Sequence, residues 1–269
     1  MQVKFYCPRW GANDDWDSFC KRVREAGYDG IETPVSSFGV PERSELLAAT
    51  RKYSLEIVGQ YYQSFEKDFD EHASNFRKHL HALAKLNPVF INSQTGKDFF
   101  DREKNSRLFE VAAEFSKETG IEVIHETHRG KALFAANISR EFLERNRDLK
   151  LTLDISHWCN VHESFLQNQT DDVDLALSRT VHIHSRVGHP EGPQVNDPRA
   201  PEWKHAVDIH MAWWDKVFDR HKKTGSPLTV TTEFGPAGYL PVLPYTQQPV
   251  ADQWDINVYM LRMLKERYK

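Results

Sequence analysis

Four side chains that can bind a metal ion lie near the ends of four β-rich runs in the second half of the chain. They are Glu126 in VIHET, Asp154 in LTLDISHW, His184 in VHIHSR and Glu233 in TVTTEFG. Successive side chains of a strand point to opposite faces. In each run the apolar residues at alternate positions would pack outward against helices, which leaves the metal-competent side chain on the inward face. The alternation therefore predicts that these four groups converge.

Three carboxylates and one imidazole in one place need a counter-charge. Like charges a few ångströms apart repel one another, and burial raises the cost. A divalent cation would resolve both problems, and three oxygen ligands with one nitrogen ligand suit Mn²⁺, Mg²⁺, Co²⁺ or Zn²⁺. The competing interpretation is four unrelated polar residues, each paired with Arg or Lys. Because the four occupy matching positions on consecutive strands, the sequence favours one divalent metal ion.

These runs belong to an alternation of short β-rich segments and longer helical segments that continues along the whole chain. Strands are predicted at 3–7, 30–33, 56–60, 89–93, 122–127, 150–155, 180–186 and 228–234. Helices are predicted at 16–26, 41–52, 69–86, 106–119, 139–146, 172–178, 206–224 and 254–267. Three of these helices are followed by a glycine, the residue most typical of a helix C-cap: Gly27, Gly120 and Gly225.

Eight β-then-α units without a break in composition predict the α/β class and one domain over residues 1–269, a single (β/α)8 TIM barrel. The alternative, a doubly wound open sheet, would need a Gly-rich phosphate-binding turn after an early strand, and the sequence has none. Two long connections, 187–203 and 235–253, carry four prolines each. Both follow predicted strands, so in a barrel both are expected to be active-site loops at its C-terminal mouth.

The order and spacing of the four groups resemble a known family. Asp154 is followed three residues later by His157, and Glu233 lies in EFGP. This order resembles that of the xylose isomerase-like barrels, the sugar phosphate isomerase/epimerase family, which includes ketose 3-epimerases and hydroxypyruvate isomerases. The segment AGYDGIE at 26–32 is also similar to that family. The resemblance spans nearly the whole chain.

The resemblance implies roles for individual residues. Glu126, Asp154, His184 and Glu233 would hold the metal ion. Glu126 and Glu233 would also be the catalytic acid/base pair, one on each face of a bound ketose, with the metal stabilising the enediolate between them. His157 matches a family position that contacts the substrate. Arg186 is predicted to bind a substrate oxygen, although the family's arginine usually lies further into the loop.

Several other residues allow two interpretations from the sequence. Glu32 and Gln60 end predicted strands, where they either contact substrate hydroxyls or satisfy backbone groups. By alternation His125 faces the helices, whereas His182 faces inward one layer below the metal site, and both are expected to be structural. Lys131 has no neighbour in the sequence that suggests a depressed pKa. No phosphate cradle is evident, and Arg129 is expected to be a solvated charge or a lid salt bridge.

Composition narrows the functional classes. Lys and Arg number 35 and Asp and Glu 39, so the formal net charge is −4, and no basic field is available for nucleic acid or an anionic membrane. The N-terminal sequence shows no signal-peptide pattern, and no run is long and apolar enough to span a bilayer. Three widely separated cysteines indicate reduced thiols rather than disulfides or a cysteine zinc site. A cytoplasmic enzyme is expected, with homo-oligomers possible through the mouth loops.

The expected function is a divalent-metal-dependent isomerase or epimerase of a small sugar or related polyol carbonyl compound. Two alternatives stay open. One is a metal-dependent lyase or hydrolase that acts on an oxidised (keto) glycoside or a cyclitol on the same barrel. The other is a barrel that binds a ligand without catalysis. An AP endonuclease is disfavoured, because the acidic net charge opposes DNA binding and no second set of metal ligands is evident.

Overall fold

The computed structural model describes residues 2–34 and 40–268, and in this part of the chain eight parallel strands close into a barrel. Each strand pairs with the next in chain order, and β1 closes the ring by pairing with β8. The strands are β1 (Val3–Pro8), β2 (Gly30–Thr33), β3 (Glu56–Tyr61), β4 (Ile91–Ser93), β5 (Val123–Glu126), β6 (Leu151–Leu153), β7 (Thr180–His184) and β8 (Leu228–Thr231). The single (β/α)8 TIM barrel predicted from the sequence is confirmed.

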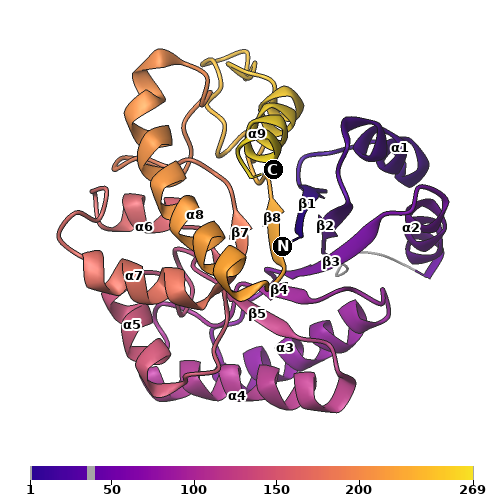
Figure 1. The fold of residues 1–269 in the computed structure, drawn as a ribbon. Helices are drawn as coiled ribbons and strands as arrows, with labels where there is room; N and C mark the ends of the chain where they lie inside the picture. Colours follow the sequence, from indigo (N-terminus) through magenta and orange to yellow (C-terminus); the bar gives the residue numbers. More distant parts are fainter. Residues whose placement is uncertain (1, 35–39, 269) are drawn as a thin grey trace.

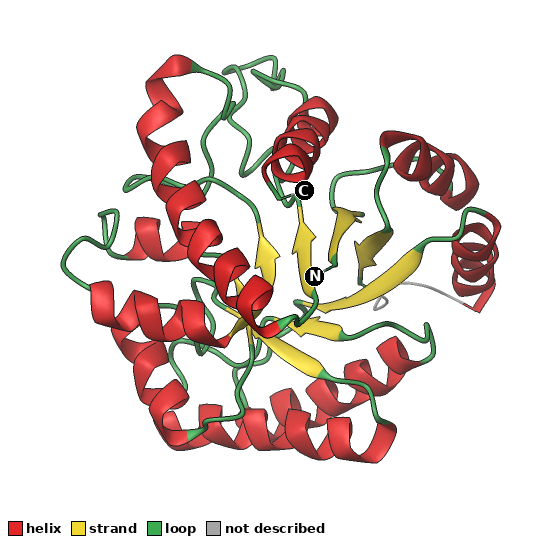
Figure 2. Ribbon diagram, viewed as in Figure 1, coloured by secondary structure: helices red, strands yellow, loops and turns green. Residues whose placement is uncertain are grey.

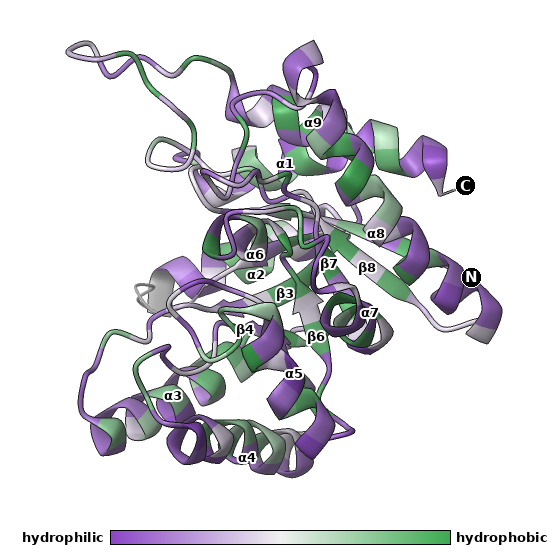
Figure 3. Ribbon diagram, turned by 90° about the vertical axis from the view of Figure 1, so that its left-hand side faces the viewer, coloured by the Kyte–Doolittle hydropathy of each residue, from purple (hydrophilic) through white to green (hydrophobic). Residues whose placement is uncertain are grey.

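The helices form an outer ring around the strands (Figure 1; Figure 2). They are α1 (Trp16–Ala26), α2 (Val40–Lys52), α3 (Phe69–Ala84), α4 (Arg102–Thr119), α5 (Ala136–Arg145), α6 (Ser156–Val161), α7 (Thr170–Arg179), the 3-10 turn η1 (Pro201–Trp203), α8 (Lys204–Thr224) and α9 (Gln253–Arg267). In the side view of Figure 3, the strands β6 and β8 are mostly hydrophobic. The helices carry both hydrophobic and hydrophilic residues. This pattern is expected of helices that pack one face on a barrel.

Local signals explain why several helices begin and end where they do. The Asp15 side chain accepts a hydrogen bond from the Ser18 amide (2.9 Å) and starts α1, and Gly27 ends it with φ 96°. The Asp101 carboxylate starts α4 in the same way, and Gly120 ends it. Caps of these kinds satisfy backbone groups that a helix end leaves without partners.

The structure contains one helix that the sequence pattern does not predict. Helix α6 has six residues and no side-chain cap, and it carries His157. In addition, the strands predicted at 150–155, 180–186 and 228–234 are longer than those observed. Asp154, Arg186 and Glu233 therefore lie just beyond the ends of β6, β7 and β8, where side chains can turn toward the barrel axis.

The barrel interior is apolar toward the N-terminal ends of the strands, and we call this part the lower layer. Tyr6, Val58, Phe90 and Ile124 form a cluster there, with Val181 packed against it. Gly30 allows the Tyr6 ring to fit, because a Cβ at position 30 would lie 2.6 Å from a ring carbon and 2.4 Å from the Glu56 carbonyl oxygen. The Tyr6 hydroxyl reaches Glu56, which also pairs with Lys4. This layer seals the base, so access to the interior is from the opposite end.

The two long connections after β7 and β8 touch each other at the mouth. The side chain of Gln194 accepts a hydrogen bond from the Gly235 amide (2.7 Å) and donates to the Gly235 carbonyl (3.3 Å). The three cysteines are buried and form no disulfide. Over residues 2–34 and 40–268, no helix combines the length and the apolar character that a membrane span requires.

Candidate functional site

The structure brings together the four side chains on which the sequence analysis depends. Glu126 ends β5, Asp154 follows β6, His184 ends β7 and Glu233 lies two residues beyond β8. One ligand atom from each lies within 4.8 Å of the corresponding atoms of the other three, and all four residues are buried. The inward positions predicted from strand alternation therefore meet at the C-terminal mouth of the barrel, where enzymes of this fold place their active sites.

Three carboxylates surround the His184 ring. Its Nδ1 is 2.7 Å from Glu233 Oε2 and 3.9 Å from Glu126 Oε2. Its Nε2 is 3.1 Å from both carboxylate oxygens of Glu32. Glu32 is held in turn by the Thr231 hydroxyl (2.5 Å) and the Asn92 amide (2.8 Å). The ring orientation of His184 is thus set from below, and Nδ1 faces the other members of the quartet.

The electrostatics of the quartet follow from burial and from crowding of like charges. Burial raises the pKa of Glu126 to about 8, and the carboxylates of Glu233 and Asp154 add to the shift. Burial also raises the pKa of Asp154, against the opposing effect of Arg186. For His184 burial by itself would lower the pKa, but the carboxylates of Glu233, Glu32 and Glu126 outweigh it and raise the pKa well above its usual value.

Arg186 forms an ion pair inside the site. Its Nη2 makes a very short contact with Asp154 Oδ2, lies 2.8 Å from His157 Nε2 and is 3.5 Å from Glu233 Oε2. The side chain is almost completely buried. A guanidinium here neutralises one charge of the quartet. It does not neutralise all three carboxylates, so room remains for a further positive charge.

The donor set fits a divalent cation. Three carboxylates and one imidazole nitrogen are ligands typical of Mn²⁺, Mg²⁺, Co²⁺ and Zn²⁺. His184 Nδ1 is buried and faces the carboxylates of the quartet, with Glu233 Oε2 2.7 Å away. An imidazole nitrogen that faces three carboxylates is the arrangement expected of a metal ligand. Two further groups of three, Glu32–His182–His184 and Glu126–His128–His157, also place ligand atoms close together.

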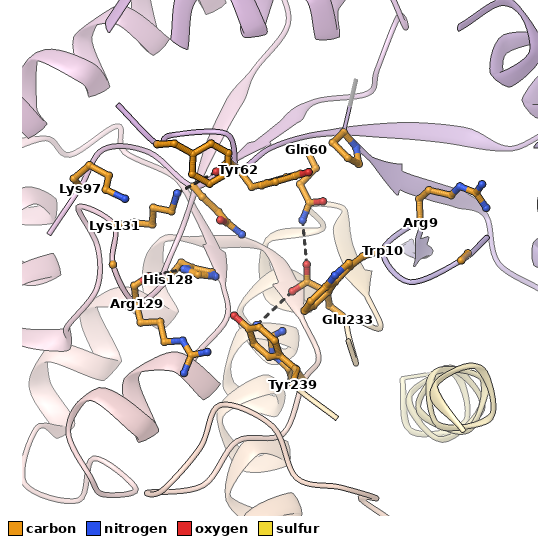
Figure 4. A pocket seen from close by; sticks show the side chains of 16 residues that line it. Arg9, Trp10, Gln60, Tyr62, Lys97, His128, Arg129, Lys131, Glu233 and Tyr239 are labelled. Atoms are coloured by element: carbon orange, nitrogen blue, oxygen red, sulfur yellow. Dashed lines mark hydrogen bonds and ion pairs between the residues drawn. The ribbon is translucent and has the colours of Figure 1, made fainter. Parts of the chain in front are cut away.

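A cavity of about 700 Å³ opens over this quartet (Figure 4). Glu233 reaches its wall and accepts a hydrogen bond from Gln60 Nε2 (3.1 Å), and Arg186 also lines it. Glu32 and His157, two predicted substrate contacts, are fully buried and are not among the described residues that line the cavity. Gln60 and Arg186 thus lie where a ligand can touch them, whereas Glu32 lies beneath His184.

The two histidines expected to be structural occupy the places predicted for them. His125 faces the helices: its Nδ1 lies 2.7 Å from Thr95 Oγ1, and its ring packs edge-on against Phe109 of α4. His182 lies below the quartet, with Nδ1 2.7 Å from Thr229 Oγ1 and Nε2 3.3 Å from Glu32 Oε2.

Some residues of the site were missed by the sequence analysis. Gln94 donates to Glu126 Oε1 (3.2 Å), and its position two residues after the inward-facing Asn92 could have indicated it. Tyr239 comes from the long loop after β8 and stacks over Arg186, which no sequence spacing indicates. The expectation for Lys131 is wrong. It is buried on the cavity wall, and burial, together with the neighbouring Lys97, lowers its pKa to about 8.

Comparisons with known proteins show the same fold in enzymes. No protein-family model matches the chain, and neither does any curated protein sequence. Among solved structures, the D-allulose 3-epimerase from Methylomonas sp. in complex with D-allulose is 17% identical with a TM-score of 0.67, over 99% of this chain and 98% of that one. A xylose isomerase domain containing protein from Salmonella typhimurium LT2 is 13% identical with a TM-score of 0.66, over 99% and 97%.

A third similar structure is that of a probable dehydratase. The probable 3-DHS dehydratase AsbF from Bacillus anthracis is 15% identical with a TM-score of 0.63, over 98% of this chain and 99% of that one. The chain shares the TIM-barrel fold of these proteins over nearly its whole length. Identities this low establish the fold and leave the reaction to be argued from the site itself.

Proposed function

We propose that this protein is a divalent-metal-dependent isomerase or epimerase of a small sugar or related polyol carbonyl compound. The observation that carries the proposal is the convergence of Glu126, Asp154, His184 and Glu233 within 4.8 Å below a cavity at the barrel mouth. These four residues would hold one ion of Mn, Mg, Co or Zn. When bound, the ion would supply positive charge where negative charge develops on the substrate oxygens.

Two glutamates would carry the proton transfers. Glu233 faces the cavity, and the hydrogen bond from Gln60 holds its Oε1, so Glu233 is placed to remove a proton from a carbon next to a carbonyl. Glu126 is held by Asn92 (2.8 Å) and Gln94 (3.2 Å). It would serve as the second acid/base group and return a proton to the enediolate, on its other face or at the neighbouring carbon.

The remaining predicted contacts receive narrower roles. Arg186 would bind a substrate oxygen while it balances the charge of Asp154. His157 would orient Arg186, from which it lies 2.8 Å. Glu32 would act as a positioning residue, because its carboxylate would accept a hydrogen bond from the N–H at His184 Nε2 and so leave Nδ1 free to bind the ion. A carboxylate behind a metal-binding histidine commonly fixes the tautomer in this way.

The likeness to a dehydratase of the same fold favours a second candidate, a lyase or hydrolase acting on a keto glycoside or a cyclitol. It would use the same proton abstraction beside a carbonyl and then expel a leaving group from the next carbon. Isomerase and lyase would therefore both exchange a C–H proton, but only a lyase would form an unsaturated product.

The test is proton exchange in D2O. The protein is purified, its metal content is measured, and candidate ketoses, cyclitol ketones and keto glycosides are followed by NMR for loss of a C–H signal. We expect exchange that stops on chelation and returns with one of the four metals. Glu233→Gln should abolish exchange, whereas the matched change at an exposed carboxylate of α4, Glu118→Gln, should not. A fully active Glu233→Gln protein would remove Glu233 from the catalytic role.

A further inference from the structure

One side of the cavity carries three cations. Lys97 follows β4, and Arg129 and Lys131 follow β5. Figure 4 shows them together on the side opposite Gln60 and Glu233. Among the residues that the structure describes, no carboxylate forms a salt bridge with any of the three. Arg129 donates instead to the neutral side chain of Asn160 (3.1 Å) and lies over the Tyr239 ring.

Lys131 is the most deeply placed of the three. The residue is 6% exposed, and its ammonium donates to the Tyr62 carbonyl (3.1 Å) and, over a very short distance, to the Ser64 hydroxyl. Both partners are uncharged. An ammonium has three N–H donors, so one remains for a ligand in the cavity. Burial and Lys97 lower the pKa of Lys131 despite the attraction of Glu126, Asp98 and Glu66, and an anion bound directly to the ammonium would offset this cost.

The described wall of the cavity carries more positive than negative charge. The ionisable lining residues of fixed charge are five cations and one carboxylate, namely Arg9, Lys97, Arg129, Lys131, Arg186 and Glu233. The other two carboxylates of the quartet, Glu126 and Asp154, are not among the lining residues, so cations outnumber carboxylates on the wall. An excess of positive charge in a cleft concentrates anionic ligands.

The cationic side and the quartet belong to one binding space. Gln94 lines the cavity next to the lysines and donates to Glu126. Gln60 lines the opposite side and donates to Glu233. A volume of about 700 Å³ lies within the range that holds a small-molecule ligand, so one molecule can touch both ends.

We propose that the substrate is an acidic sugar or polyol derivative whose carboxylate or phosphate group is bound by Lys131, Lys97 and Arg129. Its carbonyl end would lie at Glu126 and Glu233, and this placement rests on the function proposed above. Carboxylate and phosphate share the chemistry that this wall recognises, because both accept several N–H donors and carry negative charge at neutral pH.

A matched set of three ligands tests the proposal by calorimetry on the metal-loaded protein. D-fructose, D-fructose 6-phosphate and D-fructuronate differ only at C6, which bears a hydroxyl, a phosphate or a carboxylate. We expect at least one acidic ligand to bind about tenfold more tightly than D-fructose, and the tighter of the two identifies the anionic group. If neither acidic ligand binds more tightly than D-fructose, the proposal is overturned.

Substitutions locate the effect. Lys131→Met should remove most of the preference for the acidic ligand, and Lys97→Met should reduce it about threefold or more. Lys223→Met, at an exposed lysine near the end of α8, is the control and should leave it unchanged. Lys97 is half-buried and has no hydrogen bond through its ammonium in the described structure, so its variant stays informative if Lys131→Met fails to fold. A preference that survives in Lys97→Met and in a folded Lys131→Met overturns the proposal.

The outcome separates this proposal from the proposed function. If an acidic ligand is preferred through Lys131 and no ligand exchanges a C–H proton, the isomerase function fails and the anion site stands. If D-fructose exchanges as readily as its acidic counterparts and Lys131→Met changes nothing, the isomerase function stands and the anion site fails.

Discussion

The two layers of the barrel interior differ sharply although the same strands build them. The lower layer holds Ile124 of β5 in an apolar cluster, and two residues further along the strand Glu126 belongs to the buried quartet. On β3, Val58 of the lower layer is likewise followed by Gln60, which binds Glu233. His182 lies at the boundary, with its ring against Phe90 below and its Nε2 toward Glu32 above.

The difference shows how the barrel separates stability from chemistry. The lower layer excludes water with well-packed apolar groups. In the described part of the chain, the upper layer contains buried polar atoms without hydrogen-bond partners, namely Asn92 Oδ1, Thr152 Oγ1 and His157 Nδ1. Unpaired buried polar atoms are unfavourable for folding, and they concentrate at sites that bind a ligand or an ion. Substitutions in the two layers should therefore change different measurable quantities.

The largest effect is expected in the upper layer. Glu126→Gln keeps the shape of the side chain but removes both an acid/base group and a metal ligand, so C–H exchange in D2O should fall about a thousandfold or more. The thermal unfolding midpoint of the apo protein should stay close to that of the parent. A variant that retains exchange within a few-fold would place the proton transfer elsewhere.

The matched substitution two residues earlier should do the opposite. Ile124→Ala empties part of the apolar cluster and should lower the free energy of unfolding by about 2–5 kcal/mol. The exchange rate of the folded fraction should change less than about threefold. Urea unfolding and NMR exchange measured on the same sample check both statements, and a large loss of exchange without loss of stability would contradict the separation of layers.

A smaller effect is expected from the residue that supports the quartet from below. Glu32→Gln removes the charge that His184 Nε2 faces at 3.1 Å and should weaken binding of Mn²⁺ about 10–100-fold. Calorimetric titration of the apo protein measures it. Unchanged affinity would mean that Glu32 does not position His184.

The last effect concerns two histidines outside the barrel interior. Burial lowers the pKa of His125 to about 3 and that of His210 to about 4, from an ordinary value of 6.5. Below pH 6.5 the unfolded chain takes up protons at these positions that the folded chain does not. The free energy of unfolding should therefore have its full value above pH 6.5. Toward pH 4 it should fall by up to about 1.4 kcal/mol per pH unit for each histidine.

Urea unfolding between pH 7 and 5 measures this dependence. His210→Gln removes one titrating group. The free energy of unfolding should then fall less steeply with decreasing pH, by up to about 1.4 kcal/mol per pH unit. The same slope in the variant and the parent would show that His210 takes up its proton without unfolding.

Much of the fold could be predicted because local signals agree with tertiary packing. Helix α1 was predicted with its observed bounds, since Asp15 and Gly27 mark both ends. Helix α6 could not be predicted, because six residues without a side-chain cap or an apolar repeat carry no periodic signal. The predicted ends of the last two strands, Arg186 and Phe234, lie beyond the observed ends at His184 and Thr231, since β-type composition continues past the last ladder hydrogen bonds.

The candidate site was predictable to the extent that it follows strand alternation. Alternation shows which face a residue occupies, and it placed Glu126, Asp154, His184 and Glu233 on the inward face. Alternation does not show how far along the barrel axis a residue lies, because that position depends on the stagger of the strands around the closed barrel. Glu32 consequently lies under His184 rather than on the cavity wall.

The sequence by itself determined the eight β/α units, the inward quartet and the chemical type of its ligands, since each of these follows from local periodicity and side-chain identity. Only the tertiary structure decided that Arg186 pairs with Asp154, that Glu32 supports His184 and that Lys97, Arg129 and Lys131 form one side of the cavity. These contacts join segments far apart in the chain or lie in irregular loops. Their geometry depends on barrel closure and loop packing, which leave no periodic signal in the sequence.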